Sequence, residues 1–280
     1  MKDVVVGCIT NYDWDKIKFW ANSLDNSGFT GDKVIIAYNL HYDVIKELSS
    51  RGYTVYGFGK DDETEQVFYT KPNFNICLER FFHTRIFLNN LDYRYIIATD
   101  VKDVVFQKNP SEWLEQNIGD KKIVVASESI TYQDEDWGRN NMQQSFGDII
   151  YDYVKENVIY NAGTISGDFH TMMDFFLNIF LACGNSPEHV QGGGGPDQAA
   201  LNVLLNMSPY KQITKFVDSE EGWACQLGTS GNPDKFKYLT EPSPMMQDDI
   251  VTTSQGIPFT IVHQYDRIPD WKKIIEEKYS

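Results

Sequence analysis

Short apolar runs alternate with amphipathic stretches along the first hundred residues. The apolar runs fall at 4–10, 34–38, 53–58 and 95–98, and they are rich in β-branched and aromatic residues. The stretches between them repeat apolar positions at helical spacing, around 14–24, 42–51 and 75–90. Strands separated by helices of this length predict an α/β fold with a parallel sheet and right-handed crossovers.

The pattern is less regular in the second half of the chain. Apolar runs predict strands at 123–126, 213–217, 223–227 and 259–262, and two short extended pieces within 159–167. Helices are expected at 111–116 and 169–183. The polar segment that continues to Gly147 predicts an irregular lid or binding loop, since long structureless stretches in compact domains are usually functional.

One predicted strand is followed closely by two aspartates. The apolar residues 95–98 are followed by Asp100 and Asp103, after which the chain becomes apolar again. In open α/β sheets, ligands bind outside the carboxyl ends of the strands, so both acids fall where such a fold places its chemistry. A metal site is one interpretation, and a solvated turn capped by its aspartates is the other.

Composition narrows the classes of partner. The 280 residues are 41% hydrophobic, which predicts a folded globule, and the net charge is −15. Nucleic acids and anionic membranes need a basic face, so neither is an expected partner. The start of the chain has no signal peptide and no membrane-inserting span, which predicts a cytoplasmic protein. The cysteines form no CxxC pair and should be reduced.

Several further polar residues are candidates with ordinary structural alternatives. Thr10, Asn11 and Tyr12 end the first strand, where a nucleotide base and ribose would rest, although a simple turn explains them almost as well. Arg80 and Arg85 precede the acid-bearing strand and are candidates for contacts to phosphate or sugar. Their alternative is a surface ion pair with Glu79 or Asp92.

A glycine run precedes a second pair of polar residues. Gly192 to Gly195 lack the Lys-Ser/Thr of a phosphate-binding P-loop, and a flexible loop is the alternative. Pro196 suits the first turn of a helix, which puts Asp197 and Gln198 at its amino end, as functional groups or as caps. His263 follows the last apolar run and is either a third metal ligand or an ordinary half-buried histidine.

Taken together, these motifs resemble the GT-A glycosyltransferases, most closely the retaining glycogenin-like and galactosyltransferase-like family. The resemblance rests on the spaced aspartates, the Tyr-Asn-Ala-Gly step at 160–163, the glycines before Asp197 and Gln198, and the late His263 with Arg267 and Trp271. The acids are three residues apart where the family has two, and the residues after His263 lack the family's usual glycine and lysine.

The resemblance implies a single-domain GT-A fold, which is a Rossmann-like mixed sheet flanked by helices. It implies that Asp100, Asp103 and His263 hold Mn²⁺ (or Mg²⁺), which binds the diphosphate of a nucleotide sugar, expected to be UDP-linked. Asn161 and Gly163 would contribute to this donor site. Asp197 would accept hydrogen bonds from the donor sugar, and Gln198 would lie under the anomeric carbon.

The expected activity is a retaining transfer of the sugar to a carbohydrate or glycoconjugate acceptor. Residues 1–106 would form the nucleotide-binding half of the domain, and 107–280 the half for the acceptor and donor sugar. If the enzyme inverts, Glu128 or Asp136 would be the general base. Two alternatives stay open: a sugar-nucleotidyltransferase, and a catalytically silent carbohydrate-binding protein on the same scaffold.

Overall fold

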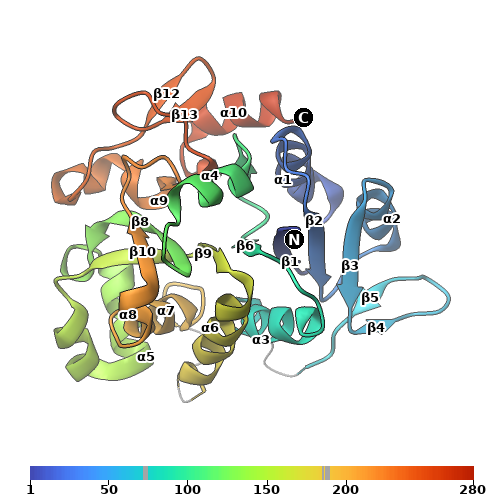
Figure 1. The fold of residues 1–280 in the computed structure, drawn as a ribbon, viewed down its shortest axis with the longest axis horizontal. Coiled ribbons are helices and arrows are strands. Elements are labelled where there is room, and N and C mark those ends of the chain that lie inside the picture. Colours follow the sequence, from blue (N-terminus) through green and yellow to red (C-terminus); the bar gives the residue numbers. More distant parts are fainter. Residues whose placement is uncertain (72–74, 185, 187–189) are drawn as a thin grey trace.

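A seven-stranded sheet forms the centre of the molecule, in the order β10-β8-β9-β6-β1-β2-β3 (Figure 1). The computed structural model describes residues 1–71, 75–184, 186 and 190–280. The strands of this sheet are β1 (Val4–Ile9), β2 (Asp32–Ala37), β3 (Tyr53–Gly57), β6 (Tyr95–Thr99), β8 (Ile123–Thr131), β9 (Val158–Asp168) and β10 (Thr214–Val217).

Helices cover both faces of the sheet, because alternate side chains of each strand point to opposite faces. Val5, for example, packs on one face, and its neighbour Val4 packs on the other. The first face is covered by α1 (Trp14–Asn26), α2 (Tyr42–Ser50) and α4 (Pro110–Asn117). The second face is covered by α3 (Ile76–Leu88), α6 (Phe169–Ala182) and α7 (Asp197–Leu205). The three-layer α/β architecture predicted from the sequence is therefore confirmed.

The sheet is mixed, as the resemblance implied, and the strands predicted in the first hundred residues pair in parallel. Strand β9 runs antiparallel to both of its neighbours, β6 and β8. It is also one strand of 11 residues, where the sequence predicts two short pieces. Its pairing with β6 places Thr164 opposite Thr99, directly before Asp100. The antiparallel strand thus brings 161–163 to the edge at which β1 and β6 end.

The segment expected to be an irregular loop is largely helical. Strand β8 continues to Thr131 and is followed by η1 (Tyr132–Asp134) and α5 (Asp136–Val154). Helix α5 is interrupted at Gly147, whose φ of 79° is favourable only for glycine. The charged stretch after β3 forms a small hairpin of β4 (Gly59–Lys60) and β5 (Val67–Phe68).

A three-stranded sheet beside the main one joins distant parts of the chain. It pairs β14 (Ile261–His263) with β11 (Ala224–Gln226) and β7 (Val104–Phe106). His263 lies opposite Gln226 on one side and Val104 on the other, so it reaches the turn that carries Asp100 and Asp103. The remaining elements are α8 (Tyr210–Ile213), α9 (Leu227–Ser230), η2 (Pro233–Tyr238), β12 (Met245–Gln247), β13 (Ile250–Thr252), η3 (Tyr265–Arg267) and α10 (Pro269–Lys278).

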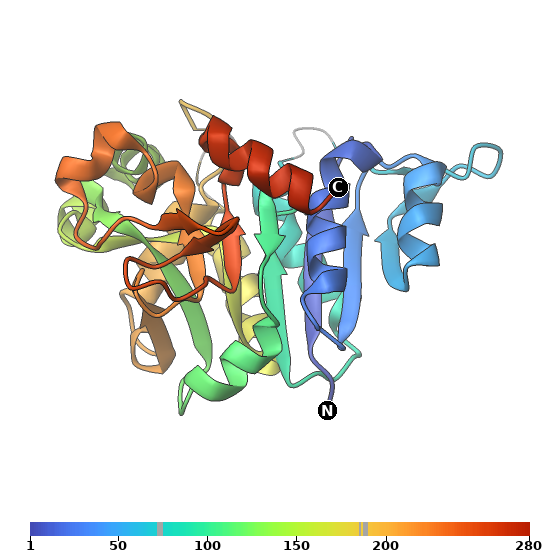
Figure 2. The ribbon, with the colours of Figure 1, turned by 90° about the horizontal axis from the view of Figure 1, so that it is seen from above.

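The last helix, α10, lies beside the first helix, α1. Figure 2 shows α10 beside α1, and the Nδ2 atom of Asn22 donates a hydrogen bond of 2.7 Å to the carbonyl of Tyr279. Across the described parts of the chain, no helix has the length and apolar character needed to cross a membrane. The four cysteines are all free thiols, as predicted.

Candidate active site

Asp100, Asp103 and His263 meet at the carboxyl end of β6. One ligand atom from each lies within 4.8 Å of the others. The Nε2 atom of His263 is 3.5 Å from Asp100 Oδ2 and 3.6 Å from Asp103 Oδ1. The chain leaves β1 for β2 on one side and returns to β6 on the other, so this group sits at the switch point of the sheet. The sequence therefore predicted this cluster correctly as a spatial group.

A hydrogen bond at Nδ1, the ring nitrogen that does not face the aspartates, orients the imidazole of His263. Its Nδ1 atom is 2.7 Å from Gln226 Oε1, and the amide nitrogen of Gln226 donates to Thr164 Oγ1 at 2.8 Å. Gln226 Oε1 is therefore the acceptor, and Nδ1 carries the proton. When the ring is neutral, this hydrogen bond leaves Nε2, which faces the two aspartates, as the nitrogen free to bind a cation, an arrangement typical of a histidine that binds metal.

The residues fit a divalent cation. Burial would lower the pKa of His263, but the Asp103 and Asp100 carboxylates outweigh burial and raise it, so the cluster attracts positive charge. Gly163 leaves the approach open: a Cβ there would lie 2.6 Å from His263 Cε1 and 2.8 Å from Asp100 Oδ2. Two carboxylates with one imidazole suit Mn²⁺, and Mg²⁺ with more difficulty.

Arg80 links this cluster to the amino end of α7. Its guanidinium forms ion pairs with Asp100 and with Asp197, the latter at 3.0 Å, and it donates to the carbonyl of Ala162 at 3.0 Å. Burial would raise the pKa of Asp100, but Arg80 and His263 hold this pKa well below its usual range. Asp100 therefore stays ionised in the folded protein.

Arg85 does not join this group. Its guanidinium donates to Asn89 Oδ1 at 2.9 Å and lies 3.6 Å from Asp174 Oδ1. The two arginines are five positions apart on one helix, which turns their side chains to different faces. The surface ion pair considered as an alternative is what the structure has, with Asp174 as the partner rather than Glu79 or Asp92.

The residues that end β1 border a separate pocket of about 410 Å³. Asn11 and Tyr12 line it together with Asn39, Leu40, His41 and residues of the β4–β5 hairpin. Thr10 lies behind them, and its Oγ1 accepts hydrogen bonds from Asn11 and Asn39. Burial and the charges of Asp100 and Asp103 raise the pKa of Tyr12 to about 12, so its phenol stays protonated.

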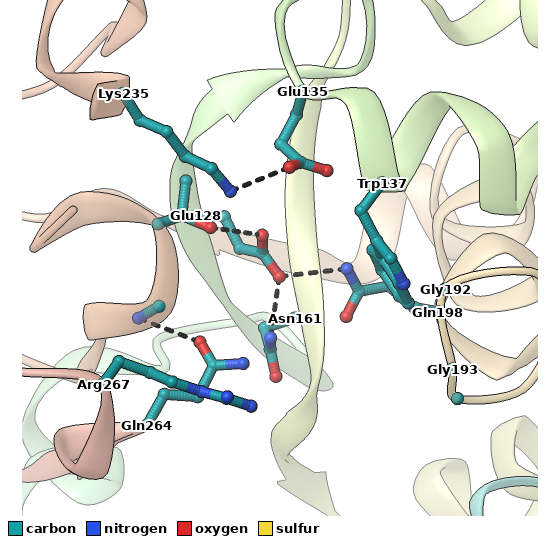
Figure 3. A pocket seen from close by; sticks show the side chains of 13 residues that line it. Glu128, Glu135, Trp137, Asn161, Gly192, Gly193, Gln198, Lys235, Gln264 and Arg267 are labelled. Carbon is teal, nitrogen blue, oxygen red and sulfur yellow. Dashed lines mark hydrogen bonds and ion pairs between the residues drawn. The ribbon is translucent and has the colours of Figure 1, made fainter. Parts of the chain in front are cut away.

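A larger pocket of about 540 Å³ is lined by residues that follow β8 and by Gln264, the residue after His263 (Figure 3). Glu128 stands at its centre and accepts hydrogen bonds from Asn161 at 2.7 Å, Gln198 at 3.0 Å and Thr229 at 3.1 Å. Burial raises the pKa of Glu128. Asn161 also accepts from the backbone N–H of Gly163 at 2.6 Å, which connects the pocket to the acidic cluster.

The other predicted carboxylates do not line this pocket. Asp197 faces Arg80 and is only 6% exposed, whereas its neighbour Gln198 reaches the pocket. Asp136 is the less favourable of the two candidate bases, since its side chain is 85% exposed and pairs with Arg139.

Several residues that line the pocket were not predicted as candidates from their own positions. Glu135 and Trp137 lie in the segment expected to be a loop, and Lys235 lies in η2. Gln264 follows His263 and adopts a left-handed conformation, with φ of 58°. Arg267 also lines the pocket, and in the sequence it was noted only as part of the resemblance. Nothing in their local sequence distinguishes these residues from ordinary surface positions.

Comparison with solved structures shows the fold of this chain to be that of glycosyltransferases. It is similar to the bifunctional glycosyltransferase WbbM in its apo form, with a TM-score of 0.61, 14% identity and coverage of 99% of this chain. The glycosyltransferase GlyE of Streptococcus pneumoniae TIGR4, as the apo form, gives a TM-score of 0.53 at 13% identity over 99% of this chain. Mouse xyloside xylosyltransferase 1, also apo, gives 0.52 at 14% identity over 93% of this chain and 97% of its own.

The chain spans 51% of the WbbM chain and 63% of the GlyE chain. No family model and no curated protein matches the sequence. At identities this low, the comparisons establish a single-domain GT-A-like fold. They do not support the narrower resemblance to the retaining glycogenin-like family.

Proposed function

We propose that this chain is a metal-dependent glycosyltransferase, which moves a sugar from a nucleotide diphosphate sugar to a carbohydrate or glycoconjugate acceptor. One observation carries the proposal: a histidine whose Nε2 atom faces two aspartates, with Nδ1 held by Gln226, lies at the switch point of a glycosyltransferase-like fold. The chain has a net charge of −15, so a diphosphate needs a local source of positive charge.

The donor is proposed to be a UDP sugar that bridges the two pockets. Thr10, Asn11 and Tyr12 would border its base and ribose, within the half formed by 1–106. Asp100, Asp103 and His263 would hold Mn²⁺ or Mg²⁺, and such an ion neutralises the charge that grows on a diphosphate leaving group. Arg267 lines the larger pocket, and its side chain is 61% exposed, so its guanidinium is available to the same phosphates.

The donor sugar would occupy part of the pocket of about 540 Å³, in the half formed by 107–280. Gln198 would lie beside the anomeric carbon. Asp197 would act on the sugar through Arg80, which it holds in an ion pair of 3.0 Å. This indirect role replaces the direct contact that the resemblance implied.

The proposed reaction retains configuration. The bond from the anomeric carbon to the phosphate oxygen breaks, the acceptor oxygen bonds to the same face of that carbon, and the acceptor proton passes to the departing phosphate oxygen. Both oxygens of Glu128 already accept hydrogen bonds from the chain, which favours an orienting role for this carboxylate over that of a general base.

Calorimetry tests the proposal by measuring the affinity of the protein for UDP, once in the presence of Mn²⁺ and once in the presence of EDTA. Tight binding that needs the metal is expected, followed by metal-dependent hydrolysis or transfer of a UDP sugar. Equal affinity in EDTA would contradict the proposal.

Product NMR then reports the anomeric configuration, and inversion would make Glu128 the general base. Pyrophosphate-dependent turnover would favour a sugar-nucleotidyltransferase, and metal-dependent binding without turnover would favour a silent carbohydrate-binding protein.

A further inference from the structure

The larger pocket has two chemically different ends, with Glu128 between them. Gln264 and Arg267, which come shortly after His263 in the chain, line one end. Glu135, Lys235 and Trp137 line the far end (Figure 3). The first end belongs to the proposed donor site. The far end takes no part in the metal cluster, and its residues come from η1 to α5 and from η2.

The charges at the far end are already paired with each other. Lys235 Nζ lies 2.8 Å from Glu135 Oε1, and the second oxygen of Glu135 accepts the backbone N–H of Gly138, where it caps α5. The Glu135 side chain is only 6% exposed. Among the described residues that line this end, no cation is left to pair with an acidic group of a ligand.

Glu128 adds a negative charge next to this end. It accepts three hydrogen bonds from neutral donors, and no ion pair joins it to a cation among the residues that the structure describes. An anionic ligand at the far end would therefore face Glu128 without a counterion, and like charges at short range in a partly buried site are costly. This end of the pocket suits an uncharged, hydroxyl-rich ligand.

Trp137 supplies a flat apolar surface beside these polar groups. It is half-buried, and the glycine run packs against its indole: a Cβ on Gly192 would lie 3.2 Å from Trp137 Cδ1, and one on Gly194 would lie 3.4 Å from Cζ2. Both glycines have positive φ, 98° and 81°, which other residues rarely adopt. The run thus holds the indole in place rather than binding phosphate.

We propose that Glu135, Trp137 and Lys235 bind the acceptor as a neutral pyranose ring. A pyranose has an apolar C–H face, which matches the indole, and hydroxyl groups around its edge, which match the Glu135–Lys235 pair as both acceptor and donor. The inference rests on the proposed function, because it assigns the second substrate of the same site. It excludes uronic and sialic acids as the acceptor residue that enters the pocket.

Saccharide binding tests this inference without the donor. Ligand-observed NMR titrations would use the methyl glycosides of glucose, galactose, mannose, xylose and N-acetylglucosamine, and the methyl glycosides of glucuronic and sialic acid. At least one neutral glycoside should bind. Its Kd should rise about tenfold or more in Trp137→Ala, and within about threefold in Trp137→Phe, which keeps an aromatic face.

Two variants separate loss of the ligand site from loss of the fold. Trp271→Ala makes the same truncation at a half-buried tryptophan that does not line the pocket, and it should leave the Kd unchanged. Glu135→Gln keeps an acceptor for the helix cap but frees the charge of Lys235, so this variant should gain affinity for the glucuronide. Thermal unfolding of each variant confirms its fold.

The inference is overturned if an acidic glycoside binds best to the natural sequence, if no neutral glycoside binds, or if Trp137→Ala leaves the Kd unchanged. The proposed function fails by a different result, namely UDP affinity that does not depend on metal. The two failures are therefore distinguishable.

Discussion

The Nδ1 atom of His263 lies 2.7 Å from Oε1 of Gln226, in a hydrogen bond that connects two neighbouring strands of the small sheet. This contact decides which ring nitrogen is free to bind a cation. It also explains why a buried glutamine, 1% exposed, stands next to the acidic cluster. An oriented imidazole binds metal more tightly than one that must be ordered on binding.

Gln226→Leu should weaken Mn²⁺ binding by about 10- to 100-fold, because it removes the acceptor that fixes the tautomer of His263. His263→Ala should weaken it further. Competition titration with a fluorescent metal indicator measures both effects. His170→Ala, at an exposed histidine paired with Asp92, is the control and should have no effect. Unchanged affinity in Gln226→Leu would mean that the imidazole is oriented by other contacts.

Asp103→Asn should reduce metal-dependent UDP affinity by at least about tenfold while leaving the fold intact. Burial and the neighbouring Asp100 and Asp266 charges raise the pKa of Asp103, with His263 and Arg267 opposing, so ionised Asp103 gains little stability from its surroundings. Removing its charge should therefore leave the thermal midpoint at or above that of the natural sequence. Calorimetry measures the metal-dependent UDP affinity, and thermal unfolding measures the midpoint. A variant that binds UDP normally would exclude Asp103 as a ligand.

Arg80→Met should destabilise the protein by about 3–5 kcal/mol, because it leaves the buried Asp197 and the half-buried Asp100 without their shared cation. Arg85→Met is the matched control on the same helix. Its surface contacts should make a difference of less than about 0.5 kcal/mol. Urea unfolding at neutral pH measures both. Equal losses in the two variants would show that Arg80 contributes only through packing of its side chain.

His83 should make stability depend on pH. Burial, together with the charge of Lys71, lowers the pKa of His83 from 6.5 to about 4. Protonation therefore favours the unfolded chain, so this contribution is complete above pH 6.5 and is lost as the pH falls toward 4. Its upper limit is roughly 3 kcal/mol. In His83→Gln, the free energy of unfolding should fall less steeply across this range than in the natural sequence. Parallel curves for the two proteins would contradict the assignment.

The fold was predictable because its signal is periodic. Alternating apolar runs and helical stretches indicated the layered sheet, and the positions of Asp100, Asp103 and His263 at strand ends indicated the cluster. The direction of β9 was not predictable, because a buried strand has the same apolar pattern whether it runs parallel or antiparallel. Local sequence also could not separate Arg80 from Arg85, whose roles depend on which helix face meets the sheet.

The pocket residues were harder to predict for a related reason. Lys235 and Glu135 are a hundred positions apart and become partners only through the fold. The polar composition of 129–147 suggested a loop, but the capped start of α5 and the contacts of its helix with α7 outweigh weak local helix propensity. Tertiary packing thus decided the structure of this segment.

The position of η1 and α5 in the chain has an evolutionary consequence. They form the connection between β8 and β9, which pair directly with each other. Mutations in this connection can change Glu135 and Trp137 while the paired strands keep Asn161 and Gly163 beside the aspartates. If the proposed roles hold, changes in this connection would alter the acceptor site and leave the donor site intact, so related proteins could modify different molecules with the same activated sugar.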